Sequence, residues 1–176
     1  MKSKIILIVG PSGAGKDTLL RHAKIVLEEK ANFVRRYITR EADLNENNYF
    51  VDKDAFELLK TNNYFASSWP AHSNLYGIPK KFIKEGLNII SISRSKIQDF
   101  EEQYENVYTI NITIPKNILR ERLISRGRES LEQIEKRLAR SYEKIEAKNL
   151  LEFDNSSSQE ISKENFIKLL NKIENE

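Results

Sequence analysis

The chain has 176 residues, 39% of them hydrophobic and 31% charged, which is typical of one soluble globular domain. Its formal net charge of +3 is too small to indicate nucleic-acid binding, and no apolar run approaches the roughly 18 residues of a membrane span. The absence of cysteine excludes disulfides, thiolate metal sites and cysteine nucleophiles. Because only five apolar residues follow Lys4, we expect no signal peptide. Together, the charge, the short apolar runs and the lack of cysteine predict a cytoplasmic location and no nucleic-acid or membrane partner.

A glycine-rich turn directly follows the first apolar run, Ile5–Val9, which predicts a buried parallel strand. The turn reads G-x-x-x-x-G-K from Gly10 to Lys16, and a helix is predicted after it, over Asp17–Lys30. Glycines let backbone N–H groups converge on phosphate oxygens, and the helix directs its positive end to the same place. This order predicts a P-loop for a nucleoside triphosphate. Its predicted binding residues are Gly10, Pro11, Ser12, Gly13, Ala14, Gly15, Lys16, Asp17 and Thr18.

The residue after the lysine departs from the P-loop pattern, which normally has a Ser or Thr that offers its hydroxyl to Mg²⁺. Asp17 stands there, and its carboxylate is a hard oxygen ligand that suits Mg²⁺, directly or through water. Thr18 is no simple substitute as a metal ligand, because one step along a helix turns a side chain by about 100°. Asp17 is therefore the predicted metal ligand, and its charge also favours the first turn of a helix.

Apolar runs and helical patterns alternate along the rest of the chain, which predicts an α/β fold with a central parallel sheet flanked by helices. Further strands are predicted over Phe33–Ile38, Leu87–Ile92, Val107–Ile114 and Leu150–Phe153. Further helices are predicted over Asp52–Lys60, Pro79–Glu85, Lys96–Tyr104, 115–125 and Ser162–Ile173. Residues 40–82 do not fit simple alternation and are expected to form an insertion over the sheet within a single domain of residues 1–176.

A capping box is predicted at the start of one more helix, where Ser130 and Gln133 are spaced to bond each other's backbone N–H groups. The apolar stripe of this long helix is predicted to consist of Leu131, Ile134, Leu138 and Ile145. Arginines gather at residues 35–40 and 120–140, which in a phosphate-binding protein indicates a second phosphate and a closing lid.

These features together resemble the guanylate kinase group of nucleoside monophosphate kinases, over about residues 4–142. The segments that carry the resemblance are the P-loop, Tyr37–Arg40, Asn74–Gly77 and Arg126–Glu129. One branch, the ribose 1,5-bisphosphate phosphokinases, is more similar still. That closer similarity lies in Gly10–Asp17 with its unusual Asp17, in Arg36–Arg40, in Ser68–Pro79, and in Arg126–Glu129 with Arg137–Arg140.

The resemblance implies a nucleoside monophosphate kinase-like architecture: a P-loop core, an acceptor-binding part over about residues 33–82 and a lid over about 122–140. It implies that Arg40, Tyr49 and Tyr76 hold the acceptor's phosphate, with Arg36 as a weaker candidate. This agrees with their chemistry, because Arg offers a bidentate fork and Tyr a neutral donor. The catalytic residues it implies are Lys16, Arg126, Arg128 and Arg137, with Arg140 next. Asn155 is expected at the edge of the adenine.

The chain departs from guanylate kinases at Ser67, where counting back from Asn74–Gly77 places their guanine-binding Glu, and at Ser91, where they carry an aspartate. A site that must hydrogen-bond its substrate can discriminate by about 10⁴–10⁵, so the loss of these acids should matter. An acceptor without a purine edge is favoured, with Ser67 near a ribose. The expected reaction is ATP- and Mg²⁺-dependent phosphorylation of ribose 1,5-bisphosphate to 5-phosphoribosyl 1-diphosphate (PRPP) plus ADP.

Other interpretations stay open. The chain could instead be a guanylate kinase or another nucleoside monophosphate kinase, a kinase for a different sugar phosphate, or a non-catalytic binding module of the same family. The intact Gly10–Lys16 motif and the lid arginines argue against the non-catalytic binding module. A nucleotide titration would separate such a module from a kinase. The resemblance is also compatible with a homodimer and with a link to phosphonate metabolism.

Overall fold

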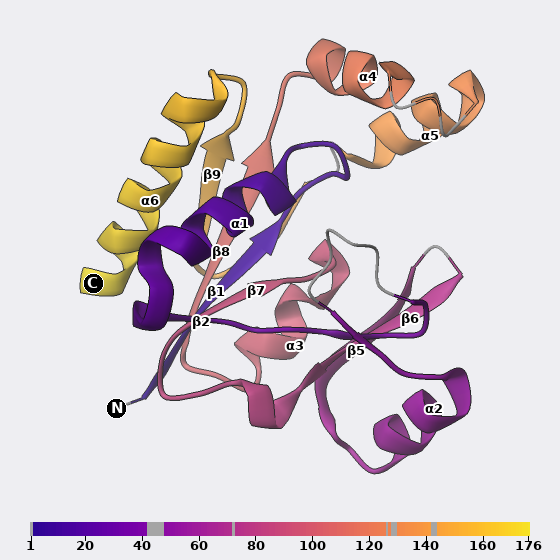
Figure 1. Cartoon of the computed structure of the whole chain (residues 1–176), viewed down its shortest axis with the longest axis vertical. Coiled ribbons are helices and arrows are strands. Elements are labelled where there is room, and N and C mark those ends of the chain that lie inside the picture. The colour runs from indigo at the N-terminus through magenta and orange to yellow at the C-terminus, as the bar shows by residue number, and fades with distance from the viewer. Residues whose placement is uncertain (1, 42–47, 72, 126, 128–129, 142–143) are drawn as a thin grey trace. The chain divides into compact units, whose positions relative to one another are not determined.

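The computed structural model describes residues 2–41, 48–71, 73–125, 127, 130–141 and 144–176, with the side chains of 140 and 141 excepted (Figure 1). A five-stranded sheet has the order β2-β7-β1-β8-β9, which confirms the predicted α/β class. Its strands are β1 Ser3–Val9, β2 Ala31–Phe33, β7 Gly86–Ser91, β8 Asn106–Thr113 and β9 Leu150–Asp154. β2 runs parallel to β7, and β8 runs parallel to β9. No helix in the described ranges is long and apolar enough to cross a membrane.

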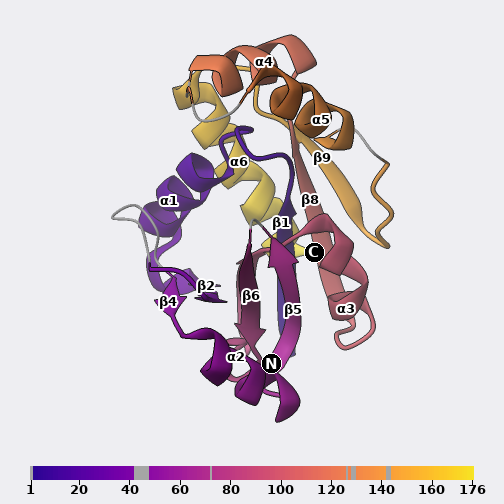
Figure 2. The same cartoon turned by 90° about the vertical axis from the view of Figure 1, so that its right-hand side faces the viewer.

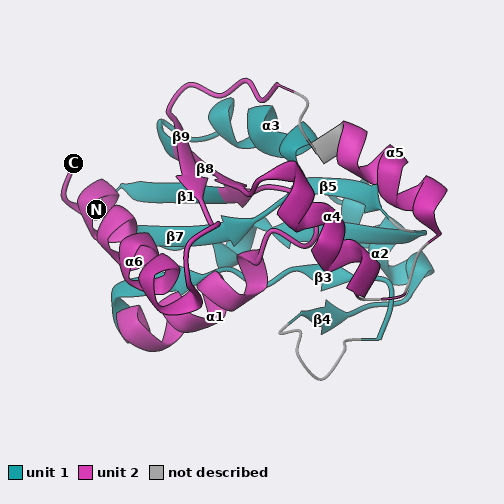
Figure 3. Ribbon diagram, turned by 90° about the horizontal axis from the view of Figure 1, so that it is seen from above, with its two compact units in different colours: residues 1–7, 29–107 teal, residues 8–28, 108–176 magenta. Residues whose placement is uncertain are grey.

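By its contacts the chain forms two compact units, residues 1–7 with 29–107, and residues 8–28 with 108–176 (Figure 3). The second unit holds the P-loop and the helices α1 Lys16–Leu27, α4 Lys116–Ser125, α5 Leu131–Ser141 and α6 Gln159–Asn175. Helix α1 packs on α6, and each helix presents buried side chains at helical spacing. These side chains are Leu19, Ala23, Leu27, Phe166 and Leu170.

The predicted capping box of α5 is confirmed. The Ser130 N–H donates to Gln133 Oε1 at 2.8 Å, and the Gln133 N–H donates to Ser130 Oγ at 3.3 Å. Ile134 and Leu138 of the predicted apolar stripe are buried, whereas Leu131 is 61% exposed, so that part of the prediction is wrong. Helix α5 packs against α4, and Arg120 of α4 pairs with Glu135 of α5 at 2.7 Å.

The first unit contains a second sheet, of order β4-β3-β6-β5, which is the expected insertion (Figure 2). Its strands are β3 Tyr37–Ile38, β4 Tyr49–Phe50, β5 Phe65–Ala71 and β6 Asn74–Pro79. β6 runs antiparallel to both β3 and β5, and β4 runs parallel to β3. Helix α2, Lys53–Thr61, begins at Asp52, whose Oδ1 accepts the Ala55 N–H at 2.9 Å.

Two sequence predictions in this unit are wrong. The single strand expected over Phe33–Ile38 is two strands, because β2 pairs with β7 while β3 pairs with β6 in the other sheet. The helix expected over Pro79–Glu85 is only a 3₁₀ turn, Lys80–Phe82. The fully buried Asn88 side chain binds the Lys84 backbone there, accepting its N–H at 2.9 Å and donating to its carbonyl at 2.8 Å. These side-chain bonds take the place of helical ones.

The region expected as a helix over Lys96–Tyr104 is a 3₁₀ turn, Arg94–Lys96, followed by the short helix α3, Ile97–Glu101. Both segments pack against β5. Ile97 and Phe100 are the buried side chains of α3, and they fix the helix to the unit. This contact matters for the site below, because it brings charged side chains to the second sheet.

Gly77 is required by the packing of Phe65. A Cβ at position 77 would lie 2.6 Å from Phe65 Cε1, and the Phe65 ring is itself held by Phe56 at 4.7 Å between centroids. We expect Gly77→Ala to lower the free energy of unfolding by about 1–3 kcal/mol, measured by urea denaturation. Gly86→Asn is the control, because position 86 has a positive φ that Asn tolerates and open space around it. Equal losses in the two variants would contradict this packing role.

Candidate nucleotide and acceptor sites

The P-loop has the backbone that its glycines predict. Gly10, Gly13 and Gly15 have φ values of 136°, 101° and 90°, which favour glycine. A Cβ on Gly10 would strike the carbonyl oxygen of Ile112 in β8, and one on Gly15 would lie 2.5 Å from the Asn155 amide. The loop is therefore shaped both by its own glycines and by the segments that pack directly against it.

Backbone N–H donors line this loop. The N–H groups of Gly13, Gly15 and Asp17 donate to no acceptor among the described residues, whereas the Ala14 N–H bonds Pro11 O at 3.2 Å. The Lys16 ammonium donates to the carbonyl oxygens of Gly10 at 2.6 Å and Pro11 at 2.8 Å. Free backbone donors beside a positioned cation are what nucleotide phosphates need, so the residues fit a nucleoside triphosphate.

The predicted metal ligand, Asp17, lies exposed in the first turn of α1. The described residues contain no group of three His, Asp or Glu side chains that could hold a metal ion by themselves. A carboxylate at this end of the P-loop nevertheless fits Mg²⁺ that is held mainly by nucleotide phosphates, which is the usual way Mg²⁺ binds in kinases. The roles of Asp17 and Thr18 stay predictions.

Asn155, expected at the adenine edge, supports the P-loop. It is buried, its Nδ2 donates to Ala14 O at 2.6 Å, and its backbone N–H donates to Thr113 O at 2.9 Å. Arg122 of α4 also reaches the loop, where its Nη1 donates to Gly13 O at 3.4 Å. Sequence reasoning missed Arg122, although it belongs to the arginine cluster at 120–140. A contact between Asn155 and adenine stays a prediction.

Part of the predicted lid, about residues 122–140, lies outside the described residues. Arg126 and Arg128 are among those left out, as is the side chain of Arg140. Arg137 is described and lies half-buried on α5. The catalytic roles of these arginines therefore stay predictions.

One face of the second sheet carries Tyr76 of β6 and Trp69 of β5, and it is called here the Tyr76 face. The Tyr76 ring stacks on Trp69 of β5 at 5.6 Å, and the Arg36 guanidinium lies over it at 5.5 Å. Arg36 Nε also donates to Asn48 Oδ1 at 3.3 Å. An arginine and an amide thus meet beside the Tyr76 ring at one end of this face. Such a donor set can bind a phosphate.

Tyr49 lies on the opposite face, because it is paired in register with Tyr37, whereas Ile38 is paired with Tyr76. Its hydroxyl accepts from Arg35 Nη1 at 3.0 Å, and its ring lies 5.6 Å from that of Phe82. Burial, and after it the Tyr64 hydroxyl, raises the pKa of Tyr37 on the same face, so this phenol stays neutral. The structure does not bring Tyr49 and Tyr76 together, and the phosphate contact of Tyr49 stays a prediction.

Ser67 lies on the Tyr76 face, two residues from Trp69, and is 4% exposed. Its hydroxyl donates to Asp99 Oδ2 at 2.7 Å, and Lys96 Nζ lies 3.2 Å from the same oxygen. Sequence reasoning missed Asp99 and Lys96, because no local pattern marks them. Arg40, the other predicted phosphate ligand, is half-buried after β3, where its Nη1 donates to Glu41 O at 3.4 Å.

Comparisons with known proteins agree with this architecture. The guanylate kinase family model matches residues 2–175. The ribose 1,5-bisphosphate phosphokinase PhnN of Desulfomicrobium baculatum is 40% identical over 162 residues, 88% of this chain and 87% of that protein. The PhnN protein of Psychromonas ingrahamii is 34% identical over 177 residues, 96% of this chain and 90% of that protein.

The fold itself matches solved structures. The crystal structure of guanylate kinase from Anaplasma phagocytophilum superposes with a TM-score of 0.67 at 19% identity, over all of this chain and 89% of that one. The chain therefore belongs to the guanylate kinase family, and within it to the group of the ribose 1,5-bisphosphate phosphokinases.

Proposed function

We propose that this protein is an ATP-dependent kinase that phosphorylates ribose 1,5-bisphosphate on its 1-phosphate, giving PRPP and ADP. The P-loop supports the donor half of this reaction, because its free N–H groups and Lys16 suit a triphosphate. The names of the similar PhnN proteins support the acceptor half. Arg36, Asn48 and Tyr76 are the proposed ligands of the acceptor's 1-phosphate, with Arg40 as a further one.

One observation favours a sugar bisphosphate over GMP as the acceptor. Ser67 bonds the carboxylate of Asp99, whose Oδ2 accepts from the Ser67 hydroxyl and pairs with Lys96. Guanine would need an uncommitted acceptor for its N1–H and N2–H₂ donors, whereas this oxygen is already engaged by two partners. This end of the Tyr76 face therefore suits an acceptor without a purine edge.

The chemistry needs little from the protein beyond position and charge. An oxygen of the 1-phosphate attacks the γ-phosphorus of ATP, and the bond from that phosphorus to the β–γ bridging oxygen breaks. ADP leaves with this oxygen and its electron pair. Because the attacking oxygen is already an anion, no general base is required.

Charge on the transferring group is neutralised by cations in this proposal. Lys16 holds the β- and γ-phosphates, and Arg126, Arg128 and Arg137 close over them from the lid. Mg²⁺, when bound, lowers the negative charge between the β- and γ-phosphates, and Asp17 is its proposed ligand. A cytoplasmic location, a homodimer and a role in phosphonate metabolism are further proposals that rest on the family alone.

Release of ADP from ATP and Mg²⁺ tests the function, with ribose 1,5-bisphosphate and GMP as separate acceptors and PRPP identified by mass spectrometry. Turnover with the sugar bisphosphate, and none above background with GMP, is the expected result. Turnover with GMP alone would make the protein a guanylate kinase, and Asp99 would then be the first residue to examine as the guanine ligand.

A further inference from the structure

Strand β4 is very short for the part that it has in the proposed acceptor site. It consists of two residues and lies at the edge of the second sheet, beside β3. The Tyr49 N–H donates to Arg36 O at 2.8 Å, and the Val51 N–H donates to Ile38 O at 3.0 Å. Because so short a pairing is only marginally stable in water, side chains must help to hold β4 in place.

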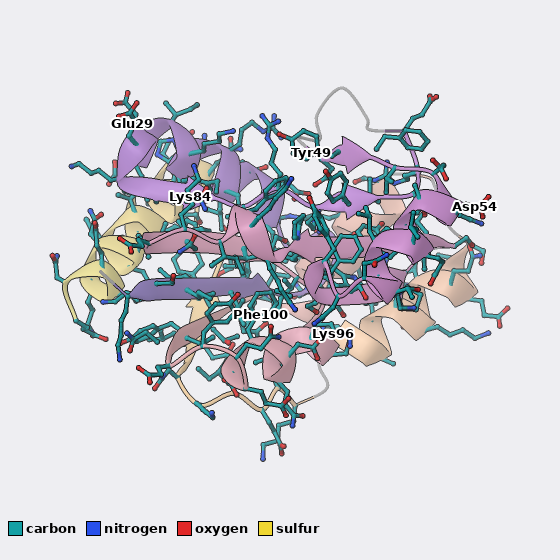
Figure 4. The ribbon with its side chains drawn as sticks, turned by 90° about the horizontal axis from the view of Figure 1, so that it is seen from below. Glu29, Tyr49, Asp54, Lys84, Lys96 and Phe100 are labelled. Carbon is teal, nitrogen blue, oxygen red and sulfur yellow. The ribbon has the colours of Figure 1, made fainter. Side chains whose placement is uncertain are left out.

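The ring of Tyr49 attaches this strand to an aromatic cluster behind the Tyr76 face. The ring, labelled in Figure 4, lies 5.7 Å from that of Tyr37 and 5.6 Å from that of Phe82. The Tyr37 and Phe82 rings stack on each other at 6.0 Å. Aromatic pairs at such distances stabilise a structure beyond the area that they bury. Since each ring contacts the other two, a shift of β4 would break two of the three contacts.

Phe82 gives the cluster a fixed base. Its carbonyl oxygen accepts from Asn32 Nδ2 at 2.7 Å, and the same amide donates to Asn88 Oδ1 at 2.8 Å. Asn32 belongs to β2, and Asn88 is fully buried in β7. The Tyr49 ring therefore packs against a segment whose own position is set by side-chain bonds to two strands of the first sheet.

The same short strand positions side chains on the opposite face. Asn48 directly precedes Tyr49, and side chains alternate between the two faces along an extended chain. Asn48 Oδ1 accepts from Arg36 Nε at 3.3 Å, and the Arg36 guanidinium lies over the Tyr76 ring. Contacts that hold Tyr49 behind the sheet therefore also hold Asn48 against Arg36 in front of it.

We propose that Tyr49 is a positioning residue for the 1-phosphate of the acceptor, and that it acts through its ring and not through its hydroxyl. The hydroxyl accepts from Arg35 Nη1 at 3.0 Å behind the Tyr76 face. Loss of the ring would let β4 shift and would separate Asn48 from Arg36, which are two of the proposed phosphate ligands. This role differs from the phosphate contact that the family resemblance implies for Tyr49, and it rests on the proposed function.

Removing the ring and the hydroxyl separately tests this inference. We expect Tyr49→Ala to raise the KM for ribose 1,5-bisphosphate about 10-fold and to leave the KM for ATP unchanged, because a misplaced binding group is costly. Tyr49→Phe should change the acceptor KM less than threefold. Tyr49 is 40% exposed, so neither variant should prevent folding. Phe82→Ala should raise the acceptor KM in the same way, although Phe82 contacts the sheet from behind.

Tyr104→Ala is the matched control. Tyr104 belongs to the same unit and stacks on Phe100 at 6.2 Å, so this variant also loses a tyrosine ring from an aromatic pair. The pair lies at α3 and does not include β4. Both KM values should stay within about twofold of the wild-type values, as is usual for a change outside the site.

A double variant shows whether Tyr49 acts through Arg36. Adding Tyr49→Ala to Arg36→Gln should raise the acceptor KM little beyond the effect of Arg36→Gln alone, because residues that act as a unit are not additive. Amide hydrogen exchange gives a readout that needs no substrate. The Tyr49 and Val51 N–H groups should exchange about 10-fold faster in Tyr49→Ala than in Tyr49→Phe, since only the first variant loses the ring contacts.

The inference is overturned by additive losses in the double variant, by equal losses in Tyr49→Phe and Tyr49→Ala, or by unchanged exchange in Tyr49→Ala. Equal losses would make the Tyr49 hydroxyl a ligand of the phosphate. Failure of the proposed function would look different, because the wild-type protein would then not turn over the sugar bisphosphate at all. The exchange rates would still decide whether the Tyr49 ring holds β4 in place.

Discussion

Lys16→Met is expected to lower kcat by about 10²–10³-fold, because it removes a positioned cation from the transferring phosphoryl group. The ammonium is already in place beside the loop, where it donates to the carbonyl oxygens of Gly10 at 2.6 Å and Pro11 at 2.8 Å. Methionine keeps most of the stem of the side chain and should preserve the packing of α1. Steady-state ADP release at saturating acceptor measures the effect.

Lys24→Met is the control for this variant, since Lys24 is an exposed lysine in the last turn of the same helix. We expect its kcat to stay within about threefold of the wild-type value, as is usual for a surface change far from the reacting atoms. If Lys16→Met kept a comparable rate, the P-loop lysine would have no part in the reaction.

Arg36→Gln is expected to lower kcat/KM for the acceptor about 100-fold while leaving the KM for ATP unchanged. The reason is the loss of a charged fork from the end of the Tyr76 face where Asn48 and the Tyr76 ring also lie. Initial rates over a matrix of both substrates would separate the two KM values.

The neighbouring arginine offers a matched control. Arg35 bonds the Tyr49 hydroxyl on the opposite face of the sheet, so Arg35→Gln should alter kcat/KM less than threefold. The two variants remove the same charge from adjacent positions. A larger loss from Arg35→Gln would place the acceptor on the Tyr49 face and would overturn the assignment of the binding face made here.

Local sequence information was sufficient for the P-loop and for the capping box of α5, because each is completed within a few residues. It was insufficient where a segment depends on distant partners. The segment Phe33–Ile38 reads as one strand, yet Phe33 ends β2, which pairs with β7, whereas Tyr37 and Ile38 form β3, which pairs with β6 in the other sheet. Asn88 likewise removes the helix expected over Pro79–Glu85, through bonds that no periodicity reveals.

The acceptor face shows the same limit. Strand β4 has only two residues, so its register with β3, and not its own pattern, decides that Tyr49 lies on one face while Asn48 meets Arg36 on the other. Ser67 was a predicted site residue, but its partner Asp99 stands 32 positions away on a helix whose docking no motif indicates. Spacing identified candidate residues, and tertiary pairing decided which of them lie together.

The support that Asn155 gives to the P-loop has a consequence for biosynthesis. The residues of the loop leave the ribosome early, but the amide that holds Ala14 O belongs to a residue 141 positions later in the chain. Contacts of such long separation form late, because a large loop of chain must be closed first. A nascent chain that ends before β9 therefore carries the complete phosphate-binding motif without its brace. Tight nucleotide binding should then appear only after residue 155 has emerged, so that ligand occupancy reports on synthesis of the C-terminal third.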